Sequence, residues 1–301
     1  MKELGVSVVI PTLNRDEFLY DSIKDMINQD YTNYEIIVVD QSDNINEKVE
    51  ELVKQNSDKI RYFRNLGFKG LPQARNFGWQ NAKHEIILYI DDDIRAEKDF
   101  VQNHVLGFRD TQVGVVGGKI IEAGMGDGEK VGRFNPWTFK LSTEFSNQTT
   151  QIVDHVKGCN FSVRKDILKQ INGFDEHINI GAALYEELEM MLRVKKNHYK
   201  ILFNANAELK HLVAIDGGCR VEDIPKYMKG LAHNRSLIIS RYLSFYHKPS
   251  VYGRLFLLGL SYSKTAKSLK PFFATIKGIK LGRVTGKLPV KCGSYTLEKE
   301  R

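Results

Sequence analysis

The stretch Glu85–Asp93 reads EIILYIDDD and joins a short apolar run to three adjacent carboxylates. Short apolar runs with β-branched residues are typical of buried strands, so the acids are expected at the carboxyl end of a strand. Open α/β sheets bind their ligands at that edge. Adjacent aspartates repel one another unless water or a cation compensates their charge. The stretch therefore indicates either a solvated acidic turn or a site for a hard cation such as Mg²⁺ or Mn²⁺, which prefers oxygen ligands.

Apolar runs before this stretch predict the rest of a sheet. Strands are expected at Gly5–Ile10, Glu35–Val39 and Lys59–Phe63, with intervening helical patterns and a helix at Gly70–Ala82. Alternating strands and helices indicate an α/β fold with a mainly parallel central sheet flanked by helices. The chain has neither a P-loop nor a G-x-G-x-x-G motif after its first strand, which argues against an ATPase or a dinucleotide oxidoreductase.

Polar side chains follow several of the predicted strands. In a parallel sheet these side chains meet at one edge, where acids can accept hydrogen bonds from a base or ribose and arginines can bind a diphosphate. The edge is therefore a candidate nucleotide site. Its residues are Thr12, Asn14, Arg15, Asp40, Asp43, Arg75 and Asp91–Asp93.

The region after the aspartates is less regular. A helix is predicted at Phe100–Phe108, and a strand at Val113–Val116 is expected to end in a turn at Gly117–Gly118. The glycine-rich segment Glu122–Asn135 is interpreted as a mobile loop. Cys159 is interpreted as a small buried apolar residue in preference to a nucleophile.

A helix is predicted to begin at Glu186-Glu187-Leu188-Glu189. Acids in a first helical turn are favoured by the helix dipole, which gives them a structural explanation. Two adjacent carboxylates at the start of a helix can also present a general base to a cleft. His211 follows a strand-like segment and by itself indicates a surface or packing residue.

Composition bounds the class of protein. The chain has 301 residues and 42% hydrophobic residues, enough for a full core. Cys159, Cys219 and Cys292 are widely spaced, which indicates a reducing compartment without a disulfide framework. The short polar start runs directly into a strand and is not typical of a signal peptide, so a cytoplasmic location is expected.

Charge divides the chain near residue 223. Residues 1–223 contain 28 Lys/Arg and 35 Asp/Glu, whereas residues 224–301 contain 16 and 2. The division predicts an acidic or neutral catalytic domain at 1–223. Residues 224–301 are predicted to form a basic helical region that meets an anionic surface.

Apolar residues recur at helical spacing through this basic region, and Pro271 is expected to bend or divide a helix. Its apolar runs are too short to span a bilayer. It is interpreted as a helical cap on the catalytic domain, a membrane-surface segment or a nucleic-acid-binding tail.

Several motifs, taken in order, resemble the inverting nucleotide-sugar glycosyltransferases of family 2, which have a GT-A-type fold. The resemblance covers about residues 5–215, and it implies nucleotide-sugar binding in about 1–118 and an acceptor and catalytic-base part in 119–223. Its motifs are Ser7-Val8-Val9-Ile10-Pro11-Thr12-Leu13-Asn14-Arg15, Tyr34–Asp40 with Ser42 and Asp43, Asn65-Leu66-Gly67, Ala74-Arg75-Asn76-Phe77-Gly78, Asp91-Asp92-Asp93, Gly158-Cys159-Asn160, Gly173-Phe174-Asp175, and Glu186-Glu187-x-Glu189 with Arg193.

The resemblance implies roles for individual residues. Mn²⁺ or Mg²⁺ would be held by Asp93, with Asp91 and His211 as further candidate ligands. Glu187 stands where the family usually has an aspartate as catalytic base, which leaves Glu186 as the alternative. The residues matched to the nucleotide-sugar site are Pro11, Thr12, Asn14, Arg15, Asp40, Asp43, Arg75, Asp91 and Asp92.

The resemblance predicts a metal-dependent inverting glycosyltransferase that transfers a sugar from a UDP or dTDP carrier to a hydroxyl of a glycan. The glycan is expected to be lipid-linked and to belong to cell-surface polysaccharide synthesis. A lipid-linked acceptor makes peripheral contact with the inner face of an anionic membrane the first expectation for the basic region, and no nucleic acid partner is expected. A sugar nucleotidyltransferase and a catalytically silent nucleotide-sugar-binding module remain as alternatives. The sequence leaves the oligomeric state open.

Overall fold

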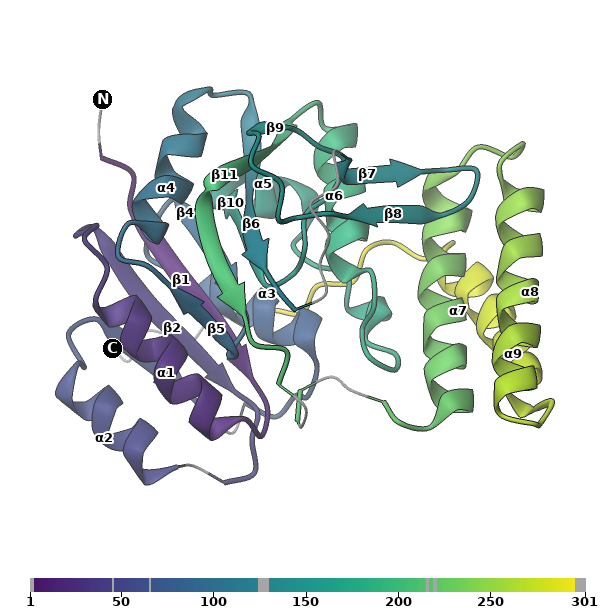
Figure 1. The fold of residues 1–301 in the computed structure, drawn as a ribbon, viewed down its shortest axis with the longest axis horizontal. Helices are drawn as coiled ribbons and strands as arrows, with labels where there is room; N and C mark the ends of the chain where they lie inside the picture. Colours follow the sequence, from purple (N-terminus) through teal and green to yellow (C-terminus); the bar gives the residue numbers. More distant parts are fainter. Residues whose placement is uncertain are drawn as a thin grey trace.

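A nine-stranded sheet organises the molecule (Figure 1). The computed structural model describes residues 3–44, 46–64, 66–123, 130–214, 217–218 and 221–295. The strand order is β3-β2-β1-β4-β10-β6-β11-β5, and β9 pairs with β11. The strands of this sheet are β1 (Val6–Thr12), β2 (Tyr34–Asp40), β3 (Ile60–Phe63), β4 (Ile86–Ile90), β5 (Ile94–Ala96), β6 (Val113–Ile121), β9 (Gln151–Ile152), β10 (Asn160–Arg164) and β11 (Lys200–His211).

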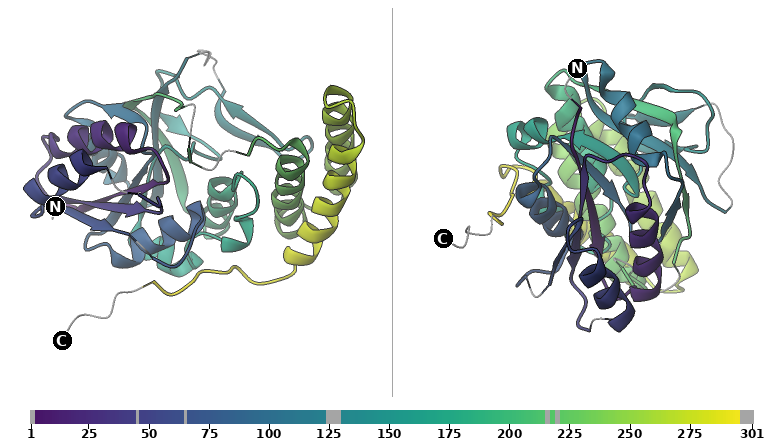
Figure 2. Two further views of the ribbon diagram at one scale, coloured as in Figure 1. Left: turned by 90° about the horizontal axis from the view of Figure 1, so that it is seen from below. Right: turned by 90° about the vertical axis from the view of Figure 1, so that its left-hand side faces the viewer.

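Strands β1 to β4 pair in parallel, as the alternating pattern predicts. Every residue of β1, β2 and β4 is buried, because helices cover both faces of this half of the sheet. The views of Figures 1 and 2 place α1 and α2 on one face and α3 on the other. The helices of the body are α1 (Asp16–Ile27), α2 (Glu47–Gln55), α3 (Leu71–Asn81), α4 (Phe100–Leu106), α5 (Lys165–Ile171) and α6 (Glu186–Lys196), with short 3₁₀ turns η1 (Gly107–Arg109) and η2 (Glu176–Ile178).

The other half of the sheet is mixed. β10 is antiparallel to both β4 and β6, whereas β6 and β11 are parallel. The predicted turn at Gly117–Gly118 is wrong, because β6 continues through both glycines. A Cβ atom on Gly118 would lie 2.1 Å from the carbonyl oxygen of Ala207, so glycine here permits close approach of two backbones.

A two-stranded hairpin follows β6. It pairs β7 (Val131–Asn135) with β8 (Lys140–Thr143). The prediction of a mobile loop at Glu122–Asn135 is therefore wrong at its carboxyl end, where Val131 is fully buried and packs in the main core. Residues 124–129 of the predicted loop lie outside the described residues.

The basic region forms a separate helical layer, seen at the right of Figure 1. It consists of α7 (Ile224–Tyr242), α8 (Lys248–Thr265) and α9 (Lys270–Thr285). The effect predicted for Pro271 is confirmed, because it lies in the first turn of α9, after the break from α8. None of the helices that the structure describes has the length and apolar character needed to cross a membrane.

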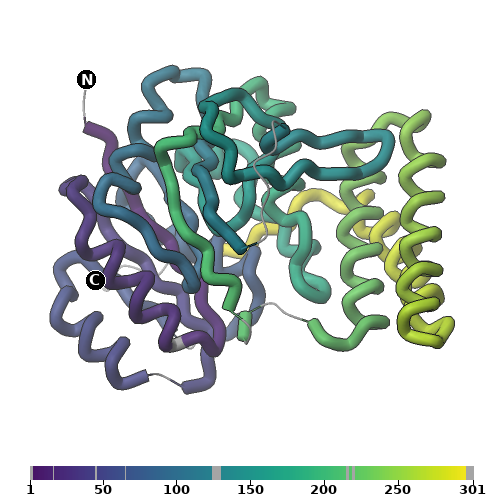
Figure 3. The backbone as a smooth tube through the Cα atoms, in the orientation of Figure 1, coloured from purple at the N-terminus to yellow at the C-terminus, as the bar shows by residue number. Residues whose placement is uncertain are grey.

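Several contacts join this layer to the body. On α7, the Arg241 guanidinium donates to the buried carboxylate of Asp175 and lies 3.4 Å from a carboxylate oxygen of Glu189 on α6. Beyond α9 the chain returns to the body as an extended segment, which Figures 2 and 3 show in yellow. The Tyr295 hydroxyl donates to Glu176 at 2.9 Å, and the Asn81 amide donates to the Tyr295 carbonyl at 2.8 Å.

Candidate active site

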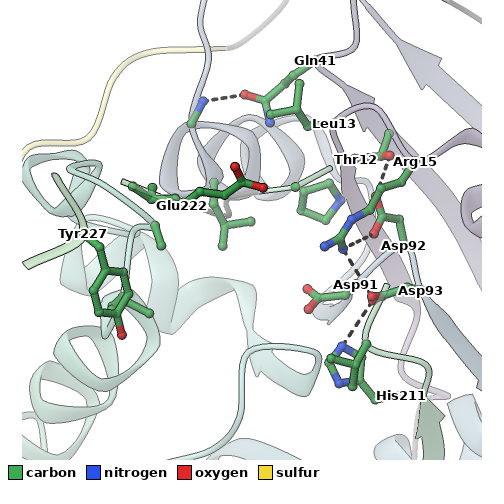
Figure 4. A pocket seen from close by; sticks show the side chains of 18 residues that line it. Thr12, Leu13, Arg15, Gln41, Asp91, Asp92, Asp93, His211, Glu222 and Tyr227 are labelled. Atoms are coloured by element: carbon green, nitrogen blue, oxygen red, sulfur yellow. Dashed lines mark hydrogen bonds and ion pairs between the residues drawn. The ribbon is translucent and has the colours of Figure 1, made fainter. Parts of the chain in front are cut away.

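A cavity of about 810 Å³ opens where β1 and β4 end (Figure 4). It brings together seven of the predicted site residues, which are Pro11, Thr12, Arg15, Asp91, Asp92, Asp93 and His211. Because β1 and β4 are parallel, the residues after each strand reach the same edge of the sheet. The structure thus assembles most of the predicted nucleotide edge around one opening.

Asp92 points inward and is held by two neighbours. The Thr12 hydroxyl donates to its Oδ2 at 2.7 Å, and an Arg15 guanidinium nitrogen donates to its Oδ1 at 3.1 Å. Burial raises the pKa of Asp92 to about 7, although Thr12 and Arg15 favour the charged form. Asp92 therefore fixes Thr12 and Arg15 at the rim of the cavity.

Asp93 and His211 meet because β5, directly after the aspartates, pairs with β11 and aligns Ile94 with His211. Asp93 Oδ2 accepts from the Ala214 amide at 2.8 Å, and its Oδ1 lies 3.3 Å from Nε2 of His211. Burial acts to raise the pKa of Asp93, but His211 and the Ala214 amide outweigh it and the pKa falls below its ordinary value. Asp93 is thus a buried anion that faces an imidazole.

Glu122 orients this imidazole. Its carboxylate lies 2.7 Å from Nδ1 of His211, which assigns the proton to Nδ1 and turns Nε2 toward Asp93. Burial acts to lower the pKa of His211, yet Asp93 and Glu122 outweigh it and raise the pKa. A carboxylate behind a ligating histidine is a common outer-shell arrangement at metal sites.

The residues at this point fit a divalent cation. Asp93 Oδ1 is buried and accepts no well-directed hydrogen bond from any described residue. Asp93 Oδ1 and the neighbouring Nε2 of His211 could therefore serve as two metal ligands. The carboxylate of Asp91, which is one-third exposed at the cavity, offers a third.

Arg75 and Glu186 form a buried ion pair behind the cavity. The Arg75 guanidinium donates to Glu186 and, at 2.9 Å, to the Gly158 carbonyl oxygen, and it lies 3.7 Å from Asp91. Burial raises the pKa of Glu186 despite the attraction of Arg75. Arg75 is only 1% exposed, so in this structure it acts on the cavity through Asp91.

Glu187 differs from its neighbour because it is half-buried. It is the second residue of α6, which follows a loop whose Ala182 and Leu184 line the cavity. Tyr185, just before α6, has φ of 71°, a left-handed conformation that turns the chain into the helix. The two candidate bases therefore differ in burial and partners. Glu186 is buried and pairs with Arg75, whereas Glu187 is half-buried and its carboxyl group lies next to that of Glu186.

Three other predicted residues lie away from the main cavity. Asp40 and Asp43 line an adjoining cavity of about 360 Å³, and Gln41 lines both. Asp40 is buried and accepts hydrogen bonds from the Tyr62 hydroxyl and the Ser42 amide. Asn14 is exposed, and its backbone N–H donates to the Ser42 hydroxyl at 2.7 Å.

Some residues at the site were not predicted. Glu122 follows the buried strand β6, so an acid directly after a strand, the signal that identified Asp40, was present here too. Tyr227, near the start of the basic region, and Glu222, just before that region, also line the cavity, which no sequence pattern indicated. Cys159 is buried, and burial raises the pKa of its thiol well above the ordinary value, in keeping with its interpretation as an inert residue.

The family described as Glycosyl transferase family 2 matches residues 7–171, more than half of the chain. The chain belongs to this family. The predicted family is thereby confirmed, and the matched span includes the aspartates and Arg75 but ends before Glu187 and His211.

Curated relatives cover much of this family 2 chain. The probable glycosyltransferase YdaM of Bacillus subtilis is 28% identical over 67% of this chain and 50% of its own length. The GalNAc(5)-diNAcBac-PP-undecaprenol beta-1,3-glucosyltransferase of Campylobacter jejuni is 28% identical over 65% of this chain and 64% of its own length. The chain thus spans about half to two-thirds of these relatives.

Solved structures confirm the GT-A-type fold. The mannosyltransferase PcManGT of Pyrobaculum calidifontis, in complex with GDP-Man and Mn²⁺, aligns with a TM-score of 0.59 at 16% identity over 96% of this chain and 78% of its own. GalNAc-T7, with UDP, GalNAc and Mn²⁺, aligns with a TM-score of 0.62 at 18% identity over 96% of this chain and 59% of its own.

Proposed function

We propose that this family 2 protein transfers one sugar from a nucleoside-diphosphate sugar to a hydroxyl of a glycan acceptor, with inversion and with the aid of Mn²⁺ or Mg²⁺. The observation that carries the proposal is the convergence of Arg15, the three aspartates and His211 on one cavity at the sheet edge. The structural neighbours PcManGT and GalNAc-T7 are complexes with a nucleotide ligand and Mn²⁺, which agrees with this chemistry.

The donor is proposed to lie across the two adjoining cavities. The base would occupy the smaller one, where Asp40 and Asp43 offer acceptors, and UDP or dTDP is the favoured carrier. The diphosphate would extend past Gln41 toward Arg15 in the larger cavity. Asp91 and Asp92 are proposed to act at the ribose end, Asp91 directly and Asp92 by fixing Thr12 and Arg15.

Asp93, His211 and Asp91 would hold the cation. When bound, the cation would neutralise charge that develops on the departing diphosphate. Arg15 lines the same cavity and contributes a further positive charge there. Arg75 is proposed to support the site indirectly, because it positions Asp91 and Glu186 from within the core.

Glu187 is proposed as the general base. The acceptor hydroxyl must lose its proton during attack, and a carboxylate within about 3 Å of it can take that proton. Glu186 is committed to Arg75, whereas Glu187 is half-buried beside the loop that lines the cavity. Attack from the face opposite the diphosphate inverts the anomeric centre, by analogy with inverting glycosidases.

The basic helical layer is proposed to hold the enzyme at the inner face of an anionic membrane. Large apolar side chains lie exposed on α8 and α9, including Leu257 at 65% and Phe273 at 56%. Exposed lysines lie on the same helices, and no acid occurs between Asp223 and Glu298. Such a surface suits anionic lipid headgroups, and a lipid-linked acceptor for surface polysaccharide would be found there.

The test is product analysis with purified full-length protein. Incubation with UDP-, dTDP- and GDP-sugars, Mn²⁺ and membrane lipid extract should release a nucleoside diphosphate from one of these donors and yield a glycosylated product. Release of pyrophosphate from nucleotide and sugar phosphate would identify a nucleotidyltransferase instead. Metal-dependent thermal stabilisation by a nucleotide without turnover would support a silent binding module.

A further inference from the structure

Cys159 has a place in the fold that its interpretation as an inert apolar residue does not explain. β10 runs antiparallel to β4 with Asn160 opposite Ile90, so the next step of this register sets Cys159 opposite Asp91. The pairing of β5 with β11 brings His211 to the same end of the sheet. Strands from three parts of the chain therefore place a thiol, a carboxylate and an imidazole together.

The three side chains are close enough to share one ion. Ligand atoms of Asp91, Cys159 and His211 all lie within 4.8 Å of one another. Ligand atoms around a tetrahedral zinc ion are about 3.3–3.7 Å apart, given metal–ligand bonds of about 2.0–2.3 Å. The cluster thus has to contract by roughly 1 Å to close on a metal.

A second observation points to a cation at this cluster. The buried Oδ1 of Asp93 accepts no well-directed hydrogen bond from the described residues and lies 3.3 Å from Nε2 of His211. Glu122 holds Nδ1 of the same ring at 2.7 Å, which leaves Nε2 to act as a ligand. The nearby cations Arg75 and Lys157 are each engaged by an acid, Glu186 and Glu122 respectively.

The chemistry of the ligands distinguishes two classes of metal. Mg²⁺ and Mn²⁺ favour oxygen ligands and gain little from a thiol. Zn²⁺ and Cd²⁺ bind sulfur and imidazole more tightly, and thiolate, imidazole and carboxylate are each ligands that zinc uses in proteins. A soft cation here would use His211, which the hard cation of the proposed function also uses.

We propose that Asp91, Cys159 and His211 form a site for a thiophilic divalent cation such as Zn²⁺ or Cd²⁺. Binding forms a metal–sulfur bond and releases the thiol proton to solvent. His211 and Asp91 are also ligands of the Mn²⁺ or Mg²⁺ ion in the proposed function. A bound Zn²⁺ or Cd²⁺ therefore excludes that ion and inhibits sugar transfer. This last consequence rests on the proposed function, whereas the metal site itself does not.

The test uses metal-free full-length protein in a thiol-free reductant, titrated with Cd²⁺ alone and with Co²⁺ alone. A thiolate bound to either ion gives a charge-transfer absorption band. The band should appear and saturate at one ion per chain in the wild type and be absent in Cys159→Ser. The matched variants Cys292→Ser and Cys219→Ser should retain it. Absence of the band in the wild type, or its persistence in Cys159→Ser, would overturn the proposal.

Glu122→Gln provides a second variant that leaves all three ligands in place. Loss of an outer-shell partner typically weakens metal binding by about 10–100-fold, so the Cd²⁺ dissociation constant should rise by that factor. An unchanged dissociation constant would contradict the role given to His211. Thermal unfolding curves of each variant without metal establish that it is folded.

The two proposals fail separately. A thiolate band without any nucleoside diphosphate release would leave the metal site standing and remove the proposed function. Mn²⁺-dependent transfer by a protein that shows no thiolate band would support the proposed function and remove the metal site. If both hold, Zn²⁺ should inhibit transfer, and added Mn²⁺ should relieve that inhibition competitively.

Discussion

Carboxylates of the same kind have different environments around the cavity. Asp91 is one-third exposed, Asp92 is hydrogen-bonded to Thr12 and Arg15, and Asp93 faces His211. The net effect of burial and neighbouring groups raises the pKa of Asp92 and lowers that of the adjacent Asp93. Glu186, which is buried and paired with Arg75, likewise differs in burial from the half-buried Glu187.

Glu187→Gln should abolish transfer without loss of nucleotide binding. The amide keeps the size of the side chain but cannot accept the acceptor's proton, and loss of a general base costs about 10²–10⁴-fold in rate. Turnover and thermal stabilisation by nucleoside diphosphate with Mn²⁺ measure the two effects. Glu186→Gln is the comparison, and it should lower thermal stability because it weakens the buried pair with Arg75. Near-normal turnover in Glu187→Gln would remove Glu187 as the base.

Asp92→Asn should stabilise the protein more at high pH than at low pH. Burial raises the pKa of Asp92 from 3.8 to about 7, so its contribution to stability is fully present below pH 3.8 and is lost as the pH rises through about 7. The asparagine does not titrate, so the difference in Tm between variant and wild type should grow from about pH 4 to pH 8. Melting curves across this range measure it, and a difference independent of pH would contradict the assigned pKa.

At the scale of elements, β6 and β11 decide the geometry of the site. Their parallel pairing has an irregularity between Asn204 and Leu209 and then runs on to Ile121 and Lys210, so Glu122 and His211 come next on the two chains and meet. Glycine at position 118 allows the Ala207 carbonyl and the Asn160 amide to approach the backbone closely. The position of the His211 imidazole thus depends on a close contact between strands several residues away.

Gly118→Ala should destabilise the fold. The added Cβ would lie 2.1 Å from a backbone oxygen, which can move only with its strand, so a loss of about 1–3 kcal/mol is expected in denaturant unfolding. Gly253→Ala on α8 is the matched control, because a Cβ there meets nothing within 4 Å. The control should be neutral or slightly stabilising, since alanine favours a helix by up to about 1 kcal/mol. Equal effects of the two substitutions would contradict the packing argument.

At the scale of the whole molecule, the basic helices belong to the active site as well as to the surface. Tyr227 on α7 and Glu222 before it line the cavity, and the last described residues bind α3 and η2. Helices α8 and α9 lie beyond α7 from the sheet (Figure 1), and several of their large apolar side chains are exposed. An enzyme attached through these two helices would keep its cavity at a fixed distance from the membrane surface.

Leu257→Glu combined with Phe273→Glu should weaken vesicle binding. Both side chains are more than half exposed, and two acids there oppose insertion and attraction to anionic lipid. Sedimentation with phosphatidylglycerol-containing vesicles should show a loss of at least about tenfold in affinity. Ile152→Glu, an exposed position on β9, should leave binding unchanged. Failure of the wild type to sediment, or equal loss in the control, would contradict membrane attachment.

The parallel half of the sheet and its acidic edge could be predicted from the sequence alone. Strands β1 to β4 are continuous apolar runs with polar residues directly after them, and burial on both faces produces that pattern locally. The same local signal identified Thr12, Asp40 and the aspartates, and the family resemblance added Glu187 and His211.

Which of these residues come into contact could be seen only in the three-dimensional structure. The turn predicted at Gly117–Gly118 was wrong because glycine there serves contact with Ala207, a residue far away in the chain. The positions of His211, Glu122 and Cys159 depend on strand pairings between distant segments, and the division between Glu186 and Glu187 depends on Arg75. Strand pairing and the choice of ion-pair partner depend on residues far apart in the chain, so they cannot be predicted from a short stretch of sequence.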